Sequence, residues 1–329
     1  MHWKDKRVLV TGAGGFIGSH LVERLAVEGA RVRTLVHYNS RNDPGLLKLL
    51  PDETLAALDL LPADLLDPFA MRQAVDGIEV VFHLGALISI PYSYIHPYHV
   101  AETNVMGTFN VLEACRAAGV RRLVHTSSSE VYGTALRVPI DEEHPLQGQS
   151  PYSASKIGAD KLAESYFCAY ELPVVTLRPF NTYGPRQSDR AVIPTIITQA
   201  LTQDVVHLGN LNARRDLTYV TDTVEGFIKV SAADDVEGKT YNLGAGSDIS
   251  IGELAETIIE LIGRSVKIKV DEARLRPEGS EVQRLLADNT LAKKDLGWEP
   301  RVSLDEGLRR TIEWISENLD LYKPGRYQV

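Results

Sequence analysis

The 329-residue chain has an ordinary globular composition, with 44% hydrophobic and 24% charged residues, and a formal net charge of -9. The acidic balance disfavours nucleic acid or an anionic membrane as a partner, and no apolar run approaches the ~20 residues that span a bilayer. The N-terminal residues lack the apolar core of a signal peptide, so we expect a soluble cytoplasmic protein. Cys115 and Cys168 suit a reducing compartment, and their apolar helical surroundings predict small core residues.

The first element is an apolar run, Arg7–Val10, of the kind found in buried parallel strands. It is followed by three glycines at three-residue intervals, Gly12, Gly15 and Gly18. Glycine permits a tight turn and lets the backbone approach a pyrophosphate at the positively polarised start of a helix. A helix and a second strand at Arg31–Val36 complete the unit, so the pattern predicts dinucleotide binding, with a plain turn as the alternative.

Strands and helices continue to alternate through the first half of the chain. Further strands are expected at Val80–Leu84, Arg122–Thr126 and Val174–Arg178, with helices at Asn104–Ala118 and around Tyr152. Repeated units of this kind predict an α/β fold, a Rossmann-like doubly wound parallel sheet. The long irregular stretch Gly133–Ser150 is predicted to be a functional loop.

After Pro179 the pattern changes to shorter elements, which predict a smaller α/β substrate-binding domain. Helices are expected at Ile193–Thr202, Ile251–Ile262 and Leu304–Leu319, strands at Val205–Leu208 and Val266–Val270, and a return to the main sheet at Tyr219–Ser231 and Tyr241–Gly244. The expected division is an NAD(P)-binding domain over 1–180, with 217–247 returning to it, and a substrate-binding region over 181–216 and 248–329.

Tyr152 and Lys156 are four residues apart in a predicted helix and therefore lie on one face. A free phenol with a pKa near 10 is a poor base at neutral pH, and a nearby ammonium favours the phenolate and lowers that pKa. Such a tyrosine takes a proton from a substrate hydroxyl while a cofactor takes the hydride. The pattern also occurs on ordinary helix surfaces, so it gains weight from the glycines before it.

Taken together, these motifs resemble the extended short-chain dehydrogenase/reductase superfamily, in its nucleotide-sugar epimerase and dehydratase branch. The markers are Thr11–Gly18, Asp64-Leu65, His83–Ala86, Ser127–Gly133, Tyr152–Lys156, Arg178–Pro185, Arg215–Asp222 and Leu296–Trp298. The resemblance covers essentially the whole chain. Its detail looks most similar to GDP-mannose-type dehydratases and to the nucleotide-N-acetylhexosamine 4,6-dehydratases of the legionaminic-acid pathway.

The resemblance implies a set of cofactor-binding residues and a preference between cofactors. The set is Gly12, Gly15, Phe16, Ile17, Gly18, His37, Asn39, Ser40, Arg41, Asp64, Leu65, Leu84, Ala86, Asn104, Thr126, Tyr152 and Lys156. NAD users place an acid at the end of the second strand, whereas this chain has none before Asp43. Arg41, with Ser40 beside it, suits a 2′-phosphate, so we expect NADP; NAD is the alternative if Arg41 is simply solvated.

Ser128, Ser129 and Glu130 carry the functional prediction. By resemblance, Ser128 shares the substrate's 4-oxygen with Tyr152, and Lys156 holds the cofactor ribose. A carboxylate at Glu130, beside that pair, supplies the proton transfers that a 4,6-dehydratase needs and an epimerase does not. Ser129 stands where dTDP-glucose dehydratases carry an Asp, so separate acid and base carboxylates are not both present. A Glu that only caps the following turn is the structural alternative.

The resemblance further implies that a nucleotide diphosphate is bound by Ser89, Asn181, Arg215, Arg276 and Arg284, because guanidinium groups match phosphate oxygens. It also implies a homodimer formed through the helices near Asn104–Ala118 and Tyr152–Tyr170. His83 and His125 are interpreted as structural, and no metal is expected. Alternatives are a 4-epimerase, a UDP-glucuronate decarboxylase and a non-catalytic NADP sensor; the last needs neither Tyr152 nor Lys156.

Overall fold

Within residues 3–324, the part of the chain that the structure describes, a computed structural model shows a seven-stranded sheet in which every neighbouring pair is parallel. The strand order is β3-β2-β1-β4-β5-β6-β10. The strands are β1 (Arg7–Thr11), β2 (Arg31–Val36), β3 (Asp59–Pro62), β4 (Val80–His83), β5 (Arg122–Thr126), β6 (Val174–Pro179) and β10 (Thr240–Leu243). The order reverses direction at β1 and β4, where doubly wound folds bind ligands.

Helices cover both faces of this sheet. One face carries α1 (Phe16–Val27) and α9 (Val220–Ala232), and the other carries α3 (Pro68–Val75), α6 (Gly107–Ala118) and α7 (Pro151–Tyr170). The central strands β4 and β6 are buried at every position, as expected for strands covered on both sides. The sheet is therefore the middle layer of a three-layer core. Helices cover its two faces, and the ends of its strands remain open for a site.

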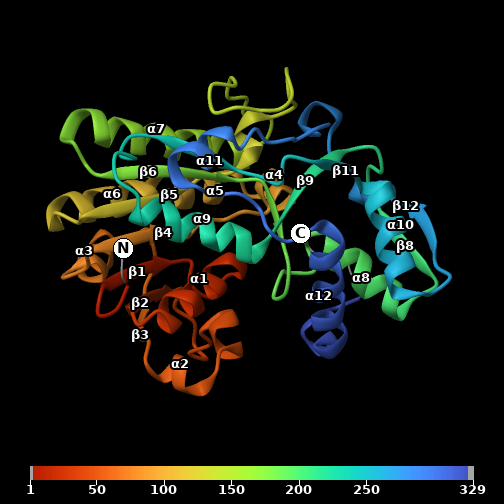
Figure 1. The fold of residues 1–329 in the computed structure, drawn as a ribbon, viewed down its shortest axis with the longest axis horizontal. Coiled ribbons are helices and arrows are strands. Elements are labelled where there is room, and N and C mark those ends of the chain that lie inside the picture. The colour runs from red at the N-terminus through yellow and green to blue at the C-terminus, as the bar shows by residue number, and fades with distance from the viewer. Residues whose placement is uncertain (1–2, 325–329) are drawn as a thin grey trace.

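A smaller part lies beside the strand ends and is seen at the right of Figure 1. It contains a three-stranded sheet of β7 (Asn181–Tyr183), β9 (Arg214–Tyr219) and β11 (Asp248–Ser250), and a two-stranded sheet of β8 (Val205–Leu208) and β12 (Lys267–Val270). Its helices are α8 (Val192–Thr202), α10 (Ile251–Ile262) and α12 (Leu304–Glu317).

Short helical segments connect the larger elements. They are η1 (Gly45–Leu49), α2 (Asp52–Ala56), α4 (Ile90–Ile95), α5 (Pro97–Ala101), η2 (Glu102–Met106), η3 (Ser129–Tyr132), η4 (Glu272–Arg274), η5 (Glu278–Ser280), α11 (Thr290–Leu296) and η6 (Leu319–Leu321). None of the helices described in residues 3–324 is long and apolar enough to cross a membrane.

The predicted fold class is confirmed, and most predicted elements occur within one or two residues of their expected bounds. The stretch expected to return to the main sheet at Tyr219–Ser231 does so as the helix α9, which packs on one face, while β10 joins the sheet as a strand. One expectation needs correction. Cys115 is buried as predicted, but Cys168 is exposed, because it lies on the outer face of α7. The division into two domains stays a prediction; β9 crosses its boundary at residue 217.

Candidate active site

A cavity of about 1010 Å³ lies along the carboxyl ends of the parallel strands and extends toward the smaller part. Its walls include residues that directly follow β1, β3, β4, β5 and β6. On the other side they include residues of β7, α8 and β9. A large concave site at this edge is where open α/β sheets bind their ligands.

Two glycines at the turn after β1, Gly12 and Gly18, have no room for a side chain. A Cβ on Gly12, which has φ +67°, would lie 2.8 Å from the backbone nitrogen of Gly85. A Cβ on Gly18 would lie 2.2 Å from the oxygen of Gly12. Gly15 begins α1 without a side-chain cap, so the first N–H groups of the helix face the cavity unblocked. This arrangement fits a dinucleotide pyrophosphate.

Asn104 braces the segment that follows β4. It lies in η2, a π-helical turn, which often marks a functional site in an otherwise regular helix. Its amide donates to the carbonyl of Leu87 at 2.9 Å and to the hydroxyl of Ser155 at 2.9 Å, and its oxygen accepts the N–H of Leu87 at 2.7 Å. Asn104 thus fixes one cavity wall to α7; it does not itself line the cavity.

The cofactor residues predicted at the strand ends are only partly brought together. Phe16, Ile17, His37, Asn39, Asp64, Leu65, Leu84, Ala86 and Thr126 line the cavity. Ser40 and Arg41 do not, and Arg41 is exposed. The hydroxyl of Thr126 is buried, with no hydrogen-bond partner among the described residues, as expected of a group that awaits a ligand. His37 Nε2 lies 3.6 Å from the Asp64 carboxylate.

Tyr152 enters the cavity from the first turn of α7. Ser150 and Ser153 cap this helix reciprocally, so it begins one residue before Tyr152. The phenol is 6% exposed and packs with Ile90 and Val100. Burial raises the pKa of Tyr152 to about 12, while a hydrogen bond with Ser128 acts in the opposite direction.

Lys156 lies one turn further along α7, behind the residues that line the cavity, and donates to the carbonyl of Thr126, which does line it, at 2.6 Å. Burial lowers the pKa of Lys156 to about 8, and the negative charge of Asp160 opposes that shift. The expectation that Lys156 lowers the pKa of Tyr152 stays a prediction, because burial is the largest influence on the phenol and Lys156 is not among the groups that shift it here. The ammonium group binds a backbone carbonyl, and burial dominates the pKa of the phenol.

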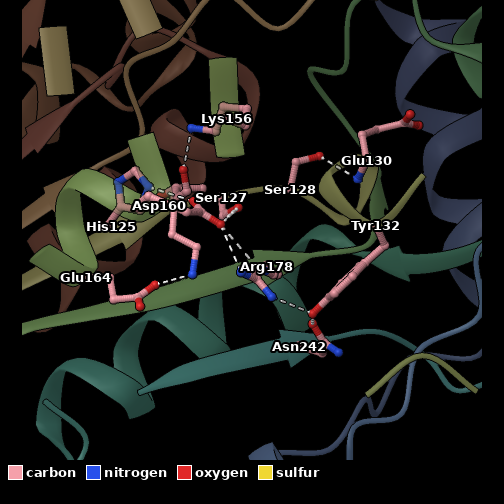
Figure 2. Close-up of polar contacts among 12 residues, drawn as sticks. His125, Ser127, Ser128, Glu130, Tyr132, Lys156, Asp160, Glu164, Arg178 and Asn242 are labelled. Atoms are coloured by element: carbon pink, nitrogen blue, oxygen red, sulfur yellow. Dashed lines mark hydrogen bonds and ion pairs between the residues drawn. The ribbon is translucent and has the colours of Figure 1, made fainter. Parts of the chain in front are cut away.

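The turn after β5 places Ser128, Ser129 and Glu130 in the cavity wall. Ser128 caps η3 by accepting the N–H of Glu130 at 3.2 Å. Glu130 is 9% exposed, and its charge acts to raise the pKa of both Tyr152 and Arg215, so its carboxylate lies near both side chains. In Figure 2, Glu130 and Tyr132 extend from this turn in opposite directions, so the carboxylate points away from the buried polar cluster below.

That buried cluster centres on Asp160. Its carboxylate accepts from the Ser127 hydroxyl at 2.7 Å, from His125 Nε2 at 3.1 Å and from the Arg178 guanidinium at 3.1 Å (Figure 2). Burial alone would raise the pKa of Asp160, but the His125 hydrogen bond and the nearby positive charges lower it overall. Asp160 was not among the predicted site residues, and the one local signal for it is its position four residues after Lys156 on the same helix face.

His83 and His125 are in structural positions, as predicted. His83 bonds the hydroxyls of Thr11 and Thr108 at 2.8 and 3.0 Å, and His125 bonds Asp160. Residues 3–324 contain no group of three or more His, Cys, Asp or Glu side chains arranged to hold a metal.

The substrate side brings together two of the predicted arginines. Arg215 is 6% exposed and lies 3.3 Å from the carboxylate of Glu281, while Arg276 lies 3.8 Å from the same oxygen. Burial lowers the pKa of Arg215, whereas the charges of Glu130 and Glu281 raise it. Glu281 was not predicted as a site residue, because nothing local links it to Arg215.

Of the remaining predicted substrate residues, two line the cavity and one does not. Ser89 lines the cavity and also caps α4. Asn181 lines it with a buried side-chain oxygen that has no partner within residues 3–324. Arg284 is outside the lining residues, because its guanidinium pairs with Asp248 at 2.5 Å.

Comparisons with known proteins identify the family. A family model described as GDP-mannose 4,6 dehydratase matches residues 9–311. The chain belongs to this family of nucleotide-sugar dehydratases and epimerases. It is thus an NAD(P)-dependent enzyme of the extended short-chain dehydrogenase/reductase superfamily.

Individual relatives include both reaction types. A UDP-glucose 4-epimerase of Mycolicibacterium smegmatis is 35% identical, with 94% of this chain and 98% of that protein covered. A dTDP-D-glucose 4,6-dehydratase of Mus musculus is 32% identical, with 97% and 91% covered. The structure of DesIV, a dTDP-glucose 4,6-dehydratase of Streptomyces venezuelae with NAD and TYD bound, superposes with a TM-score of 0.86 at 31% identity, covering 96% of this chain and 99% of that one.

Proposed function

We propose that this enzyme is a nucleotide-sugar 4,6-dehydratase. The observation that carries the proposal is the position of Glu130, a carboxylate in the cavity wall immediately after Ser128 and close enough to Tyr152 to influence its pKa. An epimerase needs only oxidation and reduction at C4, for which Tyr152 and Ser128 suffice. A carboxylate beside them adds a group that moves protons at C5 and C6.

The residues divide the reaction between them. Tyr152 accepts the proton of the 4-hydroxyl as the phenolate, which is a strong base because its pKa is raised and which the hydrogen bond with Ser128 favours. Ser128 orients the 4-oxygen and Lys156 holds the cofactor ribose. NAD(P)+, held at the glycine turn after β1, would supply a hydride acceptor for C4 and a hydride donor for C6. The 4-ketone acidifies the C5 hydrogen, so Glu130 removes that proton as a base and delivers it to the departing C6 hydroxyl, which leaves as water. A solvent proton then restores C5, and the product is a 4-keto-6-deoxy sugar nucleotide.

Arg215, Arg276 and Asn181 are proposed to bind the diphosphate of the substrate. Two guanidinium groups converge on one carboxylate there, which supports a site built for an anion with several oxygens. The N-acetylhexosamine nucleotides suggested by the sequence form one substrate class to test.

NADP is the proposed cofactor. His37, not an acid, lies at the end of β2, which supports tolerance of a 2′-phosphate. Arg41 is exposed on the same loop. If it binds the 2′-phosphate, Arg41→Ala will equalise the Kd values for NADP and NAD; a ratio that does not change removes Arg41 from this role.

A cytoplasmic homodimer is also proposed. Large apolar side chains are exposed on α4, α5, η2 and α7, at Ile95, Tyr98, Met106 and Tyr170. Such a set suits an interface between copies. Light scattering should give twice the chain mass, and Met106→Glu should give a monomer.

The proposal is tested by incubating the purified protein with UDP-, GDP-, dTDP- and CDP-sugars and measuring product masses. Loss of one water from one substrate supports the dehydratase and names its nucleotide. An isomer of unchanged mass would replace the proposal with an epimerase, and loss of carbon dioxide from UDP-glucuronate would replace it with a decarboxylase.

A further inference from the structure

The turn that carries Ser128 and Glu130 has little regular structure of its own. η3 spans only Ser129–Tyr132 and leads into the irregular stretch before α7. A short 3₁₀ turn has weak internal hydrogen bonds, so the orientation of Glu130 depends on what holds the two ends of the turn.

Both ends are held by the same buried carboxylate. At the first end, Ser127 donates its hydroxyl to Asp160 at 2.7 Å. At the second end, Arg178 donates to the Tyr132 hydroxyl at 2.9 Å and lies over its ring, 5.0 Å from the centroid. Arg178 is itself fixed to Asp160 by contacts of 3.1 and 3.3 Å.

Tyr132 continues the chain of contacts into the sheet. Its hydroxyl donates to the side-chain oxygen of Asn242 in β10 at 2.8 Å (Figure 2). The Asn242 amide donates in turn to the carbonyl of Ile140 at 3.0 Å. Every hydrogen-bonding role of the phenol is filled, so the ring has one orientation.

Asp160 also lies on the helix that carries the other reacting groups. It follows Lys156 by one turn of α7 and Tyr152 by two turns, so all three lie on one face. The carboxylate therefore links Tyr152 and Lys156 on one element to Ser128 and Glu130 on another. Buried ion pairs add little net stability by themselves, which leaves positioning as the property that this cluster supplies.

We infer that Asp160, Arg178 and Tyr132 are positioning residues that set Glu130 relative to Tyr152 for the elimination step. None of the three lines the cavity, so they act through the turn and not by contact with substrate. The inference rests on the proposed dehydration.

The test is Tyr132→Phe, which keeps the ring under Arg178 and removes only the hydroxyl. In single-turnover experiments with enzyme-bound cofactor, absorbance of the reduced nicotinamide follows C4 oxidation, and product mass follows loss of water. We expect elimination to slow about 30-fold, because a displacement well below 1 Å is costly at a reacting group, while C4 oxidation and KM change less than about threefold. Ser127→Ala, at the other end of the turn, should give the same split.

Tyr241→Phe is the matched control. Tyr241 is a buried tyrosine of β10 whose hydroxyl donates to Asp295 at 2.9 Å, outside the cavity. It should lower the Tm by a similar amount and leave both steps unchanged, which separates positioning from a general loss of stability.

The outcomes distinguish failure of the positioning role from failure of the proposed dehydratase function. The positioning role would be overturned if both Tyr132→Phe and Ser127→Ala slowed oxidation and elimination equally, or slowed neither step. The proposed dehydration by the wild-type enzyme would still stand in that case. A wild-type protein that oxidises C4 but releases no water would refute the proposed function, and the inference with it. The expected split supports both.

Discussion

The two sides of the cavity are built differently. The cofactor side uses the ends of parallel strands and one glycine turn, and each of its residues lies within a few positions of a strand that a local apolar run can reveal. The substrate side joins residues that are far apart: Arg215 meets Glu281 across 66 positions. The cofactor side is thus fixed by regular backbone, whereas the substrate side depends on charged side chains that pair with one another.

This difference predicts how each side responds to mutation. A change on the cofactor side that spares the backbone should affect the chemical step and leave binding intact. A change on the substrate side should affect binding, because its arginines are held by a carboxylate that a diphosphate can replace.

The largest effect is expected from Tyr152→Phe. Loss of the base at the 4-hydroxyl should reduce kcat about a thousandfold, whereas the Kd of the cofactor should not change. Tyr166→Phe, on the same helix with its hydroxyl on Glu113, is the control and should retain full turnover. Unchanged turnover in Tyr152→Phe would remove the tyrosine from the mechanism.

Glu130→Gln should have the next largest effect. The amide keeps the shape of the carboxylate but moves no protons, so loss of water should slow about a hundredfold. C4 oxidation, followed through reduced cofactor, is the internal control and should persist. A variant that dehydrates at the wild-type rate would show that Glu130 only caps its turn.

Arg215→Met examines the substrate side. Removing a charge-assisted contact with the diphosphate should raise KM about tenfold to a hundredfold with a smaller change in kcat. Arg214→Met is the control, because the adjacent Arg214 pairs with Asp248 and Glu253 away from the cavity. An equal rise in both variants would contradict the assignment.

The smallest effect is expected on stability, at a contact between the cofactor side and the substrate side of the cavity. His20 of α1 bonds the carbonyl of Pro185, which follows β7, at 3.0 Å. Burial lowers the pKa of His20 to about 4, below its unfolded value of 6.5. The unfolded chain therefore takes up a proton first as the pH falls, so the free energy of unfolding should drop by up to about 2 kcal/mol between pH 7 and 5.

His20→Gln keeps a donor to Pro185 but does not titrate. The Tm of this variant should fall less than that of the wild type over the same pH range. Burial also lowers the pKa of His83 and His125, so part of the acid sensitivity should remain. Identical pH profiles would show that His20 is not charged differently in the two states.

The sequence predicted elements with a local signal better than contacts between distant parts of the chain, which is also the difference between the two sides of the cavity. The strand at Arg31–Val36 and the strand at Arg122–Thr126 were located to the residue, because continuous apolar runs are a local signal. β3 was not located, since its apolar pair Leu60-Leu61 is bounded by Asp59 and Pro62 and three of its four residues are exposed. The three-stranded sheet was also missed, because β7 and β11 have only three residues each and its three strands lie far apart in the chain.

The site residues were likewise predictable only where they belong to a local motif. Tyr152, Ser128 and Glu130 were found because each belongs to a compact motif, and the cavity brings them together. The motif could not show that Arg284 pairs with Asp248, or that Glu281 lies between Arg215 and Arg276, since those contacts arise only from tertiary folding. The effect of burial on the pKa of Tyr152 was likewise invisible in the sequence.

The most direct test of the central claim is the mass of the product formed in deuterated water from the nucleotide sugar that the enzyme accepts. If Glu130 removes the C5 proton and water leaves from C6, the product will have lost one water and gained a single deuterium at C5. A product of the same composition as its substrate, with no deuterium on carbon, would contradict the account and show that the reaction stops at C4.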